Sequence, residues 1–236
     1  MTAPLEGLRL VTVAHGTRTT AGNLVAAELT AAAGERLGVE ATTSYVELCE
    51  PLLTDVVATT DRPTVVVPLL LSTGYHLRHD LPGSVAAAQR PELVRLGGAL
   101  GPDPLLAAAQ VDRLREAGAT PGQPVVMVAA GSSDPLATDD LEAAAALLAA
   151  AWGAPVRLAT LSALGTRPEH VVRPGDAVSP YLLATGHFHR KARHDSLAAG
   201  ASVVADVIGP HPRLVDLVCA RATALVGTGR GRLLAG

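Results

Sequence analysis

The first half of the chain alternates short apolar runs with longer stretches rich in alanine and leucine. An apolar run over 8–14, a His-Gly pair and an Ala/Leu-rich stretch over 23–37 predict a buried strand, a turn and a helix. Further strands are expected near 41–47, 64–71 and 94–97, each followed by a helical stretch. Successive strand-helix units predict a parallel sheet with helices on both faces.

The same pattern restarts after a Gly/Pro-rich break, and the two halves align in the same order. The aligned segments are 11–16 with 126–131, 68–74 with 180–186, and 101–104 with 209–212. We therefore predict a tandem duplication in an α/β protein, in which each domain is a four-stranded parallel sheet flanked by helices. The predicted domains cover 1–118 and 125–236, and residues 119–124 form the linker.

The two halves differ at polar positions. His15 aligns with Ala130 and His76 aligns with Phe188, whereas the glycines and prolines of the aligned segments are largely shared. We therefore expect one site in the first half, with the degenerate second half closing a cleft over it. The duplication supplies both sides of such a cleft, so a monomer would be sufficient.

Composition excludes several function classes. A formal net charge of −3 argues against a broad basic surface for nucleic acids, and 2% aromatic residues leave little for base stacking. No apolar run reaches the ~18 residues of a membrane span. Cys49 and Cys219 are far apart and form no Cys-x-x-Cys motif. We expect a cytoplasmic protein without a disulfide framework that binds neither nucleic acid nor membranes.

Three side chains suited to metal binding follow the first three expected strands. His15 follows the first strand, Glu47 ends the second and His76 follows the third. In a sheet of order 2-1-3-4 these strands are neighbours, and ligands bind at the carboxyl ends of the strands. Each residue alone has a structural explanation, as a turn histidine or as a carboxylate near a helix start. Together, two imidazoles and a carboxylate suit a divalent first-row metal that must exchange or react.

Three ordered motifs resemble the class II tetrapyrrole chelatases, the sirohydrochlorin cobaltochelatase and ferrochelatase family. The motifs are HGTR at 15–18 with Asn23, ELCEPL at 47–52, and VPLLLSTGYHLRHDLP at 67–82. The resemblance spans essentially the whole chain, because long members of that family are built from two chelatase-like halves.

The resemblance implies insertion of Co²⁺ or Fe²⁺, with Ni²⁺ as a further candidate, into sirohydrochlorin for cobalamin or sirohaem synthesis, without a nucleotide. By motif match, His15 and His76 would bind the incoming metal and Glu47 would assist them. Arginines suit the carboxylates at the rim of this tetrapyrrole, and a loop with a permissive glycine suits its flat face. The expected substrate-binding residues are Arg18, Leu71, Ser72, Thr73, Gly74, Tyr75, Arg78, Arg190 and Lys191.

Other interpretations remain open. His187, His189 and His194 form a second cluster, for which carboxylate binding or a solvated helix start is favoured over metal because no matching carboxylate accompanies it. A non-catalytic metal-binding or delivery protein would use the same ligands. A phosphatase with His15 as nucleophile is disfavoured, because Ala14 stands where such enzymes have an arginine.

Overall fold

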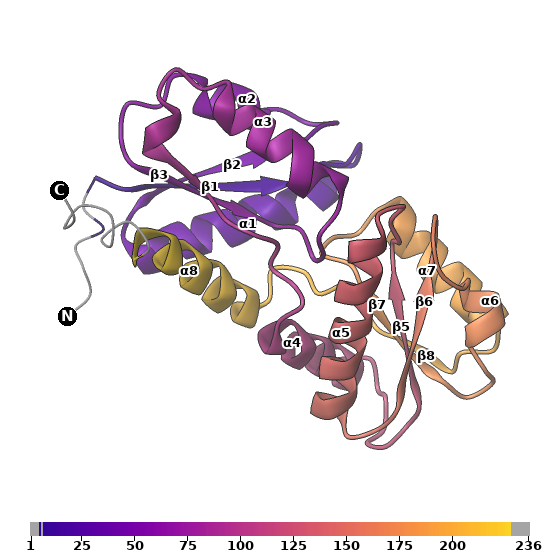
Figure 1. Ribbon diagram of the computed structural model, residues 1–236. Helices are drawn as coiled ribbons and strands as arrows, with labels where there is room; N and C mark the ends of the chain where they lie inside the picture. The colour runs from indigo at the N-terminus through magenta and orange to yellow at the C-terminus, as the bar shows by residue number, and fades with distance from the viewer. Residues whose placement is uncertain (1–4, 6, 228–236) are drawn as a thin grey trace. The chain divides into compact units, whose positions relative to one another are not determined.

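The computed structural model describes residue 5 and residues 7–227, which form two four-stranded parallel sheets (Figure 1). The strands are β1 Arg9–Ala14, β2 Glu40–Tyr45, β3 Thr64–Pro68, β4 Val94–Leu96, β5 Val125–Ala129, β6 Val156–Thr160, β7 Ala177–Tyr181 and β8 Val203–Val204. Their orders are β2-β1-β3-β4 and β6-β5-β7-β8. The predicted fold class, a duplicated four-stranded parallel α/β unit, is confirmed.

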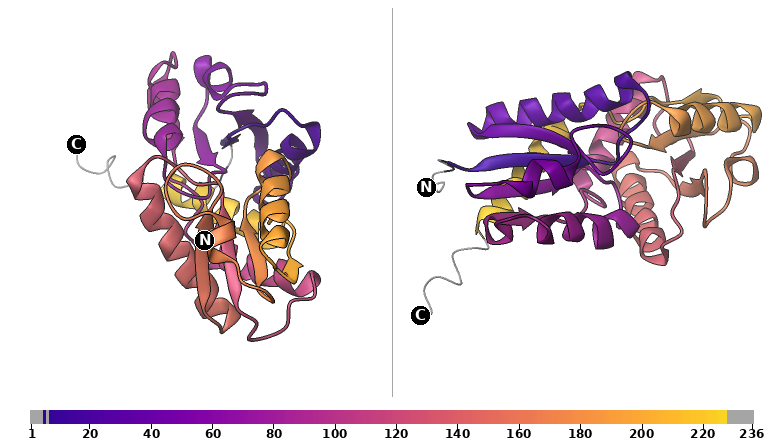
Figure 2. Two further views of the ribbon diagram at one scale, coloured as in Figure 1. Left: turned by 90° about the vertical axis from the view of Figure 1, so that its right-hand side faces the viewer. Right: turned by 90° about the horizontal axis from the view of Figure 1, so that it is seen from above.

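Helices cover both faces of each sheet (Figure 2). The helices are α1 Thr20–Leu37, α2 Leu53–Ala58, η1 His76–Asp80, α3 Leu81–Ala86, η2 Pro91–Leu93, α4 Pro104–Glu116, α5 Pro135–Trp152, α6 Pro168–Val171, α7 His187–Ala198 and α8 Pro212–Gly227. The helix expected after Leu77 begins one residue before it, with η1 as a π-helical turn that leads directly into α3. No helix in the described part of the chain is long and apolar enough to span a membrane. Cys49 and Cys219 are free thiols.

The chain forms two compact units that exchange their last helices. Among the described residues, the first unit contains those up to Leu70, Tyr75–Leu100 and those from Leu214 onward. The second contains Leu71–Gly74 and Gly101–Arg213, so α4 belongs to the second unit and most of α8 to the first. The domains predicted over 1–118 and 125–236 follow the repeats along the chain. The compact units differ from them, because α4 of the first repeat is part of the second unit and most of α8 of the second repeat is part of the first unit.

Side chains of the first sheet alternate between its two faces, as the pleat of a strand requires. Val11 and Val13 of β1 are fully buried and pack with Leu53 of α2 and other apolar residues on one face. Thr12 faces the other side, where its hydroxyl lies 2.5 Å from that of a threonine in α1. Burial on both faces explains why β1 is a continuous apolar run.

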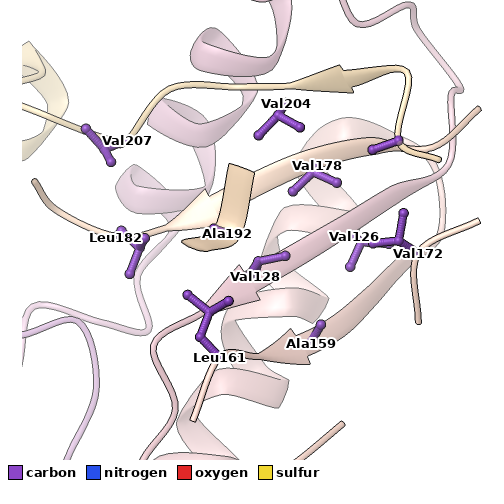
Figure 3. Close-up of a cluster of buried hydrophobic side chains, with 11 residues drawn as sticks. Val126, Val128, Ala159, Leu161, Val172, Val178, Leu182, Ala192, Val204 and Val207 are labelled. Carbon is purple, nitrogen blue, oxygen red and sulfur yellow. The ribbon is translucent and has the colours of Figure 1, made fainter. Parts of the chain in front are cut away.

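The second unit has an apolar core of the same kind. Val126 and Val128 of β5 and Val178 of β7 are fully buried, and Ala192 of α7 packs against them (Figure 3). Because the central strands of both sheets are buried on both faces, polar chemistry is expected in the loops at the strand ends.

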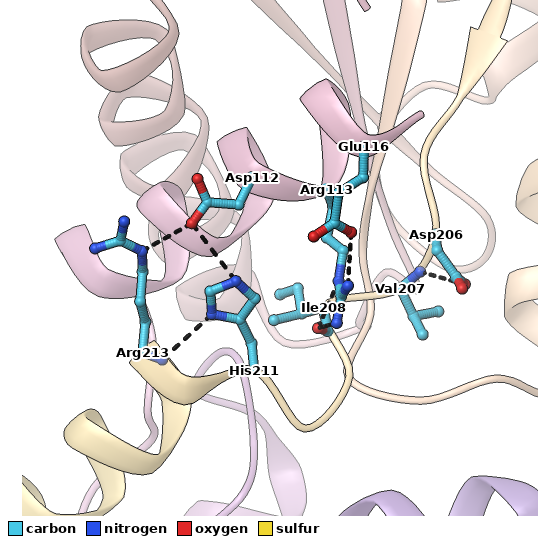
Figure 4. A network of polar contacts seen from close by, with 8 residues as sticks. All are labelled: Asp112, Arg113, Glu116, Asp206, Val207, Ile208, His211 and Arg213. Atoms are coloured by element: carbon cyan, nitrogen blue, oxygen red, sulfur yellow. Dashed lines mark hydrogen bonds and ion pairs between the residues drawn. The ribbon is translucent and has the colours of Figure 1, made fainter. Parts of the chain in front are cut away.

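An arginine fixes each exchanged helix in the unit that receives it. In the second unit, Arg113 of α4 donates two hydrogen bonds to the carbonyl of Ile208, at 3.1 and 3.0 Å (Figure 4). In the first unit, Arg221 of α8 donates to the carbonyl of Leu100 at 3.0 Å. The two pairs are related by the same offset as the aligned residues Gly101 and Gly209. The exchange is therefore a feature of both repeats.

The first amides of the exchanged helices are capped by different side chains. Asp103 accepts a hydrogen bond from the amide of Leu105 at the start of α4, at 2.9 Å. The aligned residue His211 uses Nδ1 to accept from the amide of Arg213 at 3.2 Å, while its Nε2 lies 3.5 Å from Asp112 (Figure 4). Accepting at Nδ1 requires the neutral imidazole. Burial, followed by the positive charge of nearby arginine side chains, lowers the pKa of His211.

Candidate functional site

The loops that carry His15 and Glu47 are joined by continuation of the parallel ladder. The amide of Val46 donates to the carbonyl of Ala14 at 2.9 Å, and the amide of Glu47 donates to the carbonyl of His15 at 3.2 Å. These bonds extend the pairing of β1 with β2 beyond the last strand residues. His15 and Glu47 therefore leave the same edge of the sheet at neighbouring positions.

Gly16 allows these two loops to approach closely. Its φ is +93°, and an added Cβ would collide with the carbonyl oxygen of Glu47. Asn23, at the start of α1, then clamps the turn: its Oδ1 accepts from the amide of Thr17 at 3.0 Å, and its Nδ2 donates to the carbonyl of Thr17 at 2.8 Å. The backbone after β1 is thus held on both sides, which explains why Asn23 accompanies the His-Gly motif.

His15, Glu47 and His76 converge at this edge of the first sheet. One ligand atom from each lies within 4.8 Å of the others, and Nε2 of His15 is 3.7 Å from Oε1 of Glu47. The two imidazole rings meet edge to face, with centroids 4.7 Å apart and planes at 86°. Across residue 5 and residues 7–227, no other group of three histidine, cysteine or carboxylate side chains is as close. The structure brings together the three residues that the sequence singled out.

The spacing of the three candidate ligand atoms is compatible with binding of one divalent ion. Bonds of about 2.1 Å from a divalent metal to nitrogen or oxygen place two ligands of a tetrahedral ion about 3.4 Å apart. Separations of up to 4.8 Å therefore need only small side-chain rotations to close on an ion. Three protein ligands leave coordination positions open, as in sites where the metal exchanges or reacts.

Asp80 orients one of the imidazoles and was not predicted from the sequence as a site residue. Its Oδ2 lies 2.6 Å from Nδ1 of His76, and the two residues are the last and the first of η1. A carboxylate on one ring nitrogen fixes the tautomer and leaves the other nitrogen as the metal ligand. Nε2 is thus the free nitrogen of His76. The His-x-x-x-Asp spacing within a helical stretch is the signal that could have found Asp80.

Comparison with known proteins shows the family of the chain. The model of the CbiX family matches residues 9–117 and 124–225, which together make up most of the chain. The chain belongs to the CbiX family. The resemblance to class II tetrapyrrole chelatases in their two-repeat form is thereby confirmed. No curated protein matches the chain in sequence.

Solved structures share the fold of this CbiX-family chain. SirB from Bacillus subtilis with Fe³⁺ is 24% identical, with a TM-score of 0.77 over 95% of this chain and 98% of that one. The sirohydrochlorin chelatase SirB from Bacillus subtilis subspecies spizizenii in complex with cobalt is 23% identical, with a TM-score of 0.74 over 95% and 97%. CbiX, described as the terminal enzyme of sirohaem biosynthesis in denitrifying bacteria, is 21% identical, with a TM-score of 0.66 over 92% and 98%.

Two exposed side chains with apolar surface lie next to the candidate metal ligands. Tyr75, directly before His76, is 63% exposed, and its ring packs against that of His79 at 4.6 Å. Leu48, directly after Glu47, is 50% exposed and has a φ of +65°. Ala163, the aligned residue of the second repeat, also has a positive φ. The strained turn is therefore present in both repeats, including the one that lacks the candidate metal ligands. Leu48 was not among the site residues predicted from the sequence.

The remaining residues predicted to bind substrate are distributed over both units. Arg18 and Arg78 are exposed in the first unit, close in sequence to His15 and His76. Residues 71–74 belong to the second unit. Arg190 is exposed on α7, and Lys191 is paired with Asp195 of the same helix at 2.6 Å. Their contact with a substrate stays a prediction.

The corresponding edge of the second sheet has no matching ligands. Ala130 and Phe188 occupy the histidine positions, and Ser162, which takes the place of Glu47, donates to the carbonyl of Ala130 at 2.8 Å. Of the second histidine cluster, His189 lies 3.5 Å from Asp206. The scaffold of the loop is thus kept in the second repeat while its ligand set is lost.

Proposed function

We propose that this protein inserts a divalent metal ion, Co²⁺ or Fe²⁺, into sirohydrochlorin without using a nucleotide. The observation that carries the proposal is the convergence of His15, Glu47 and His76 at the carboxyl edge of one parallel sheet. The names of similar structures support it, since one is a sirohydrochlorin chelatase in complex with cobalt and another holds Fe³⁺.

The ion enters as a substrate and must leave again. Nε2 of His76, Nε2 of His15 and a carboxylate oxygen of Glu47 would bind it, and the open coordination positions would receive the ring nitrogens. The first ring nitrogens would enter these open positions, and the remaining ones would then displace the three protein ligands. Partly exposed ligands without a fourth protein partner favour this exchange over tight retention.

Insertion also releases two protons. A divalent ion replaces the hydrogens of two ring N–H groups, so the product is the neutral metal-nitrogen core and two protons that need an acceptor. As the ion moves to the ring, Glu47 and the imidazole of His15 lose their metal bond and regain a lone pair. Their side chains are 51% and 48% exposed, so each can pass its proton on to water.

Exposed side chains around the ligands suit a flat macrocycle with an acidic rim. Tyr75 and Leu48 offer apolar surface beside the two ligand loops. Arg18 and Arg78 would bind peripheral carboxylates, because a guanidinium matches a carboxylate with two parallel hydrogen bonds. Arg190 and Lys191, which belong to the second repeat, are proposed to bind further carboxylates of the tetrapyrrole.

The ligand set alone ranks the metals weakly. Sites built from imidazole and carboxylate follow the same general order of affinity for iron, cobalt and nickel ions. The availability of each ion in the cell therefore usually decides which one is bound. We propose Co²⁺ or Fe²⁺ as the ion, which places the reaction in cobalamin or sirohaem synthesis, with Ni²⁺ as a further candidate.

Anaerobic metallation of sirohydrochlorin tests this function. The protein is mixed with sirohydrochlorin and Co²⁺, Fe²⁺ or Ni²⁺ in turn, without nucleotide, and the absorption spectrum of the macrocycle is followed against the uncatalysed rate. The proposal expects catalytic turnover with at least one ion. Binding of the ion with no increase in the rate of insertion would instead identify a metal-binding or delivery protein.

A further inference from the structure

We propose that Asp140 and Tyr181, both in the second repeat, position the metal ligand His76 by fixing the four residues 71–74 that precede Tyr75 and His76. These four residues come from the first repeat, yet they belong to the second unit. The chain then passes from Gly74 directly into Tyr75 and His76 of the first unit.

Asp140 holds the end of this segment that is nearer to His76. Its Oδ2 accepts a hydrogen bond from the amide of Thr73 at 2.6 Å, across a sequence separation of 67 residues. Asp140 lies on the long helix α5, whose N-terminus is capped by Asp134. A short bond from an amide to a carboxylate on a rigid helix is a strong and directional restraint.

Tyr181, the last residue of β7, holds the other end of the segment. Its hydroxyl donates to the carbonyl of Leu71 at 2.9 Å, and its side chain is only 3% exposed. Burial, followed by the negative charges of Asp140 and Asp103, raises the pKa of Tyr181. The hydroxyl therefore stays protonated over the working range of pH and remains a donor.

Gly101 provides the space for the bond from Tyr181. An added Cβ at Gly101 would collide with the hydroxyl of Tyr181 and with the carbonyl of Leu71. The backbone at Gly101 therefore lies directly against the Tyr181–Leu71 contact, which leaves no room for a side chain at this position.

The second repeat restrains a loop of the first repeat through these two side chains, and the aligned residues of the first repeat do not do the same in return. Asp140 aligns with Val25, and Tyr181 aligns with Leu69, so neither aligned side chain of the first repeat can form such a hydrogen bond. The segment it would hold, which leads to Phe188, carries no metal ligand. The polar pair is thus present only for the loop that leads to His76.

This inference rests on the proposed role of His76 as a metal ligand, and it gives the second repeat a task other than metal binding. Asp140 and Tyr181 do not touch the ion, so they are positioning residues. Two polar restraints within the five residues before His76 limit the paths the backbone can take into η1, and they act whether or not a tetrapyrrole is bound.

Hydrogen exchange in the full-length protein tests the restraint directly. Asp140→Ala should speed exchange of the amides at 72–74 by about 10- to 100-fold, the effect of losing a charge-assisted hydrogen bond, and should leave β5 and α5 protected. Asp140→Asn keeps an oxygen acceptor and should restore much of the protection. The matched control is Asp139→Ala, which removes an exposed carboxylate from the neighbouring position of the same helix.

Calorimetric titration with Co²⁺ alone then tests the link to His76. Asp140→Ala should weaken Co²⁺ binding by roughly three- to thirtyfold, the range of coupling through a neighbouring element. The loss should disappear when Asp140→Ala is combined with His76→Ala, and it should persist in combination with His15→Ala. Tyr181→Phe, which keeps the buried ring, provides a second variant with the same expected pattern.

Two results would overturn the inference. One is unchanged exchange at 72–74 in both Asp140→Ala and Tyr181→Phe. The other is an equal loss of Co²⁺ affinity with and without His76, because the effect would then not pass through that ligand. Neither measurement uses the tetrapyrrole, so a protein that follows the expected pattern but fails to metallate sirohydrochlorin would contradict the proposed function and leave this inference standing.

Discussion

Replacing Asp80 by alanine tests whether the imidazole of His76 is held ready for the metal. The carboxylate of Asp80 lies 2.6 Å from Nδ1 of His76 and fixes the ring so that Nε2 is free. In Asp80→Ala the ring keeps its place on η1, but it can rotate and can place its proton on either nitrogen. Only a fraction of the molecules would then present Nε2 in the orientation that binds the ion.

The size of the effect follows from the exposure of the pair. Loss of such a carboxylate partner weakens metal affinity by about 10- to 100-fold in protein metal sites. The side chains of His76 and Asp80 are 31% and 43% exposed, so water replaces part of the lost hydrogen bond. We expect a loss near the lower limit, about tenfold, which corresponds to ~1.4 kcal/mol of binding free energy.

Titration with Co²⁺ under anaerobic conditions measures this loss. Asp80→Asn keeps an oxygen that accepts from Nδ1–H and should recover most of the affinity. Asp61→Ala removes a carboxylate that is 88% exposed and has no histidine partner, and it controls for the change in net charge. Wild-type Co²⁺ affinity in Asp80→Ala, with wild-type rates of insertion, would refute the argument that Asp80 prepares His76.

Three further predictions follow from the site and from the cap of α8. Glu47→Gln should reduce the rate of insertion more than the affinity for Co²⁺ if Glu47 accepts a proton, and equal losses in both assays would make it a ligand only. Gly16→Ala should lower the free energy of unfolding by about 1–3 kcal/mol in denaturant titrations, because the new Cβ meets the carbonyl of Glu47. The pKa of His211 is lowered in the folded protein, so the unfolded chain binds the proton more readily. The free energy of unfolding should therefore be highest above the unfolded pKa of ~6.5 and should decrease as the pH falls from there toward the lower pKa of the folded state. His211→Asn, which can still cap the amide of Arg213, should flatten this decline in thermal unfolding between about pH 7.5 and pH 5, and an unchanged slope would show that the decline comes from other groups.

The parallel sheets could be predicted from the sequence, and so could the meeting of the three candidate ligands once a strand order of 2-1-3-4 is assumed. Buried parallel strands read as apolar runs, and residues that directly follow neighbouring strands must meet at one edge of the sheet. For His15, Glu47 and His76 the strand order was the one piece of spatial information needed, and the structure has that order, β2-β1-β3-β4. Asp80 required one further step, since its spacing from His76 is meaningful only once the stretch is known to be helical.

The exchange of α4 and α8 could not be predicted in the same way. Both helices carry apolar residues that suit either of two similar sheets, and the local pattern does not record which sheet a helix meets. The bond from Thr73 to Asp140 depends on that long-range arrangement as well. Hydrophobic periodicity specifies the elements, whereas these contacts depend on how the elements pair in space.

The rate of metal insertion into sirohydrochlorin, compared between matched histidine variants of the two repeats, decides which repeat carries the reaction. His15→Ala and His76→Ala should each lose most of the catalysed rate in folded protein. The double variant His187→Ala with His189→Ala should at most raise KM and keep kcat near the wild-type value. A loss of kcat in the double variant as severe as in His15→Ala, or wild-type rates in His15→Ala and His76→Ala, would contradict the placement of the reaction in the first repeat.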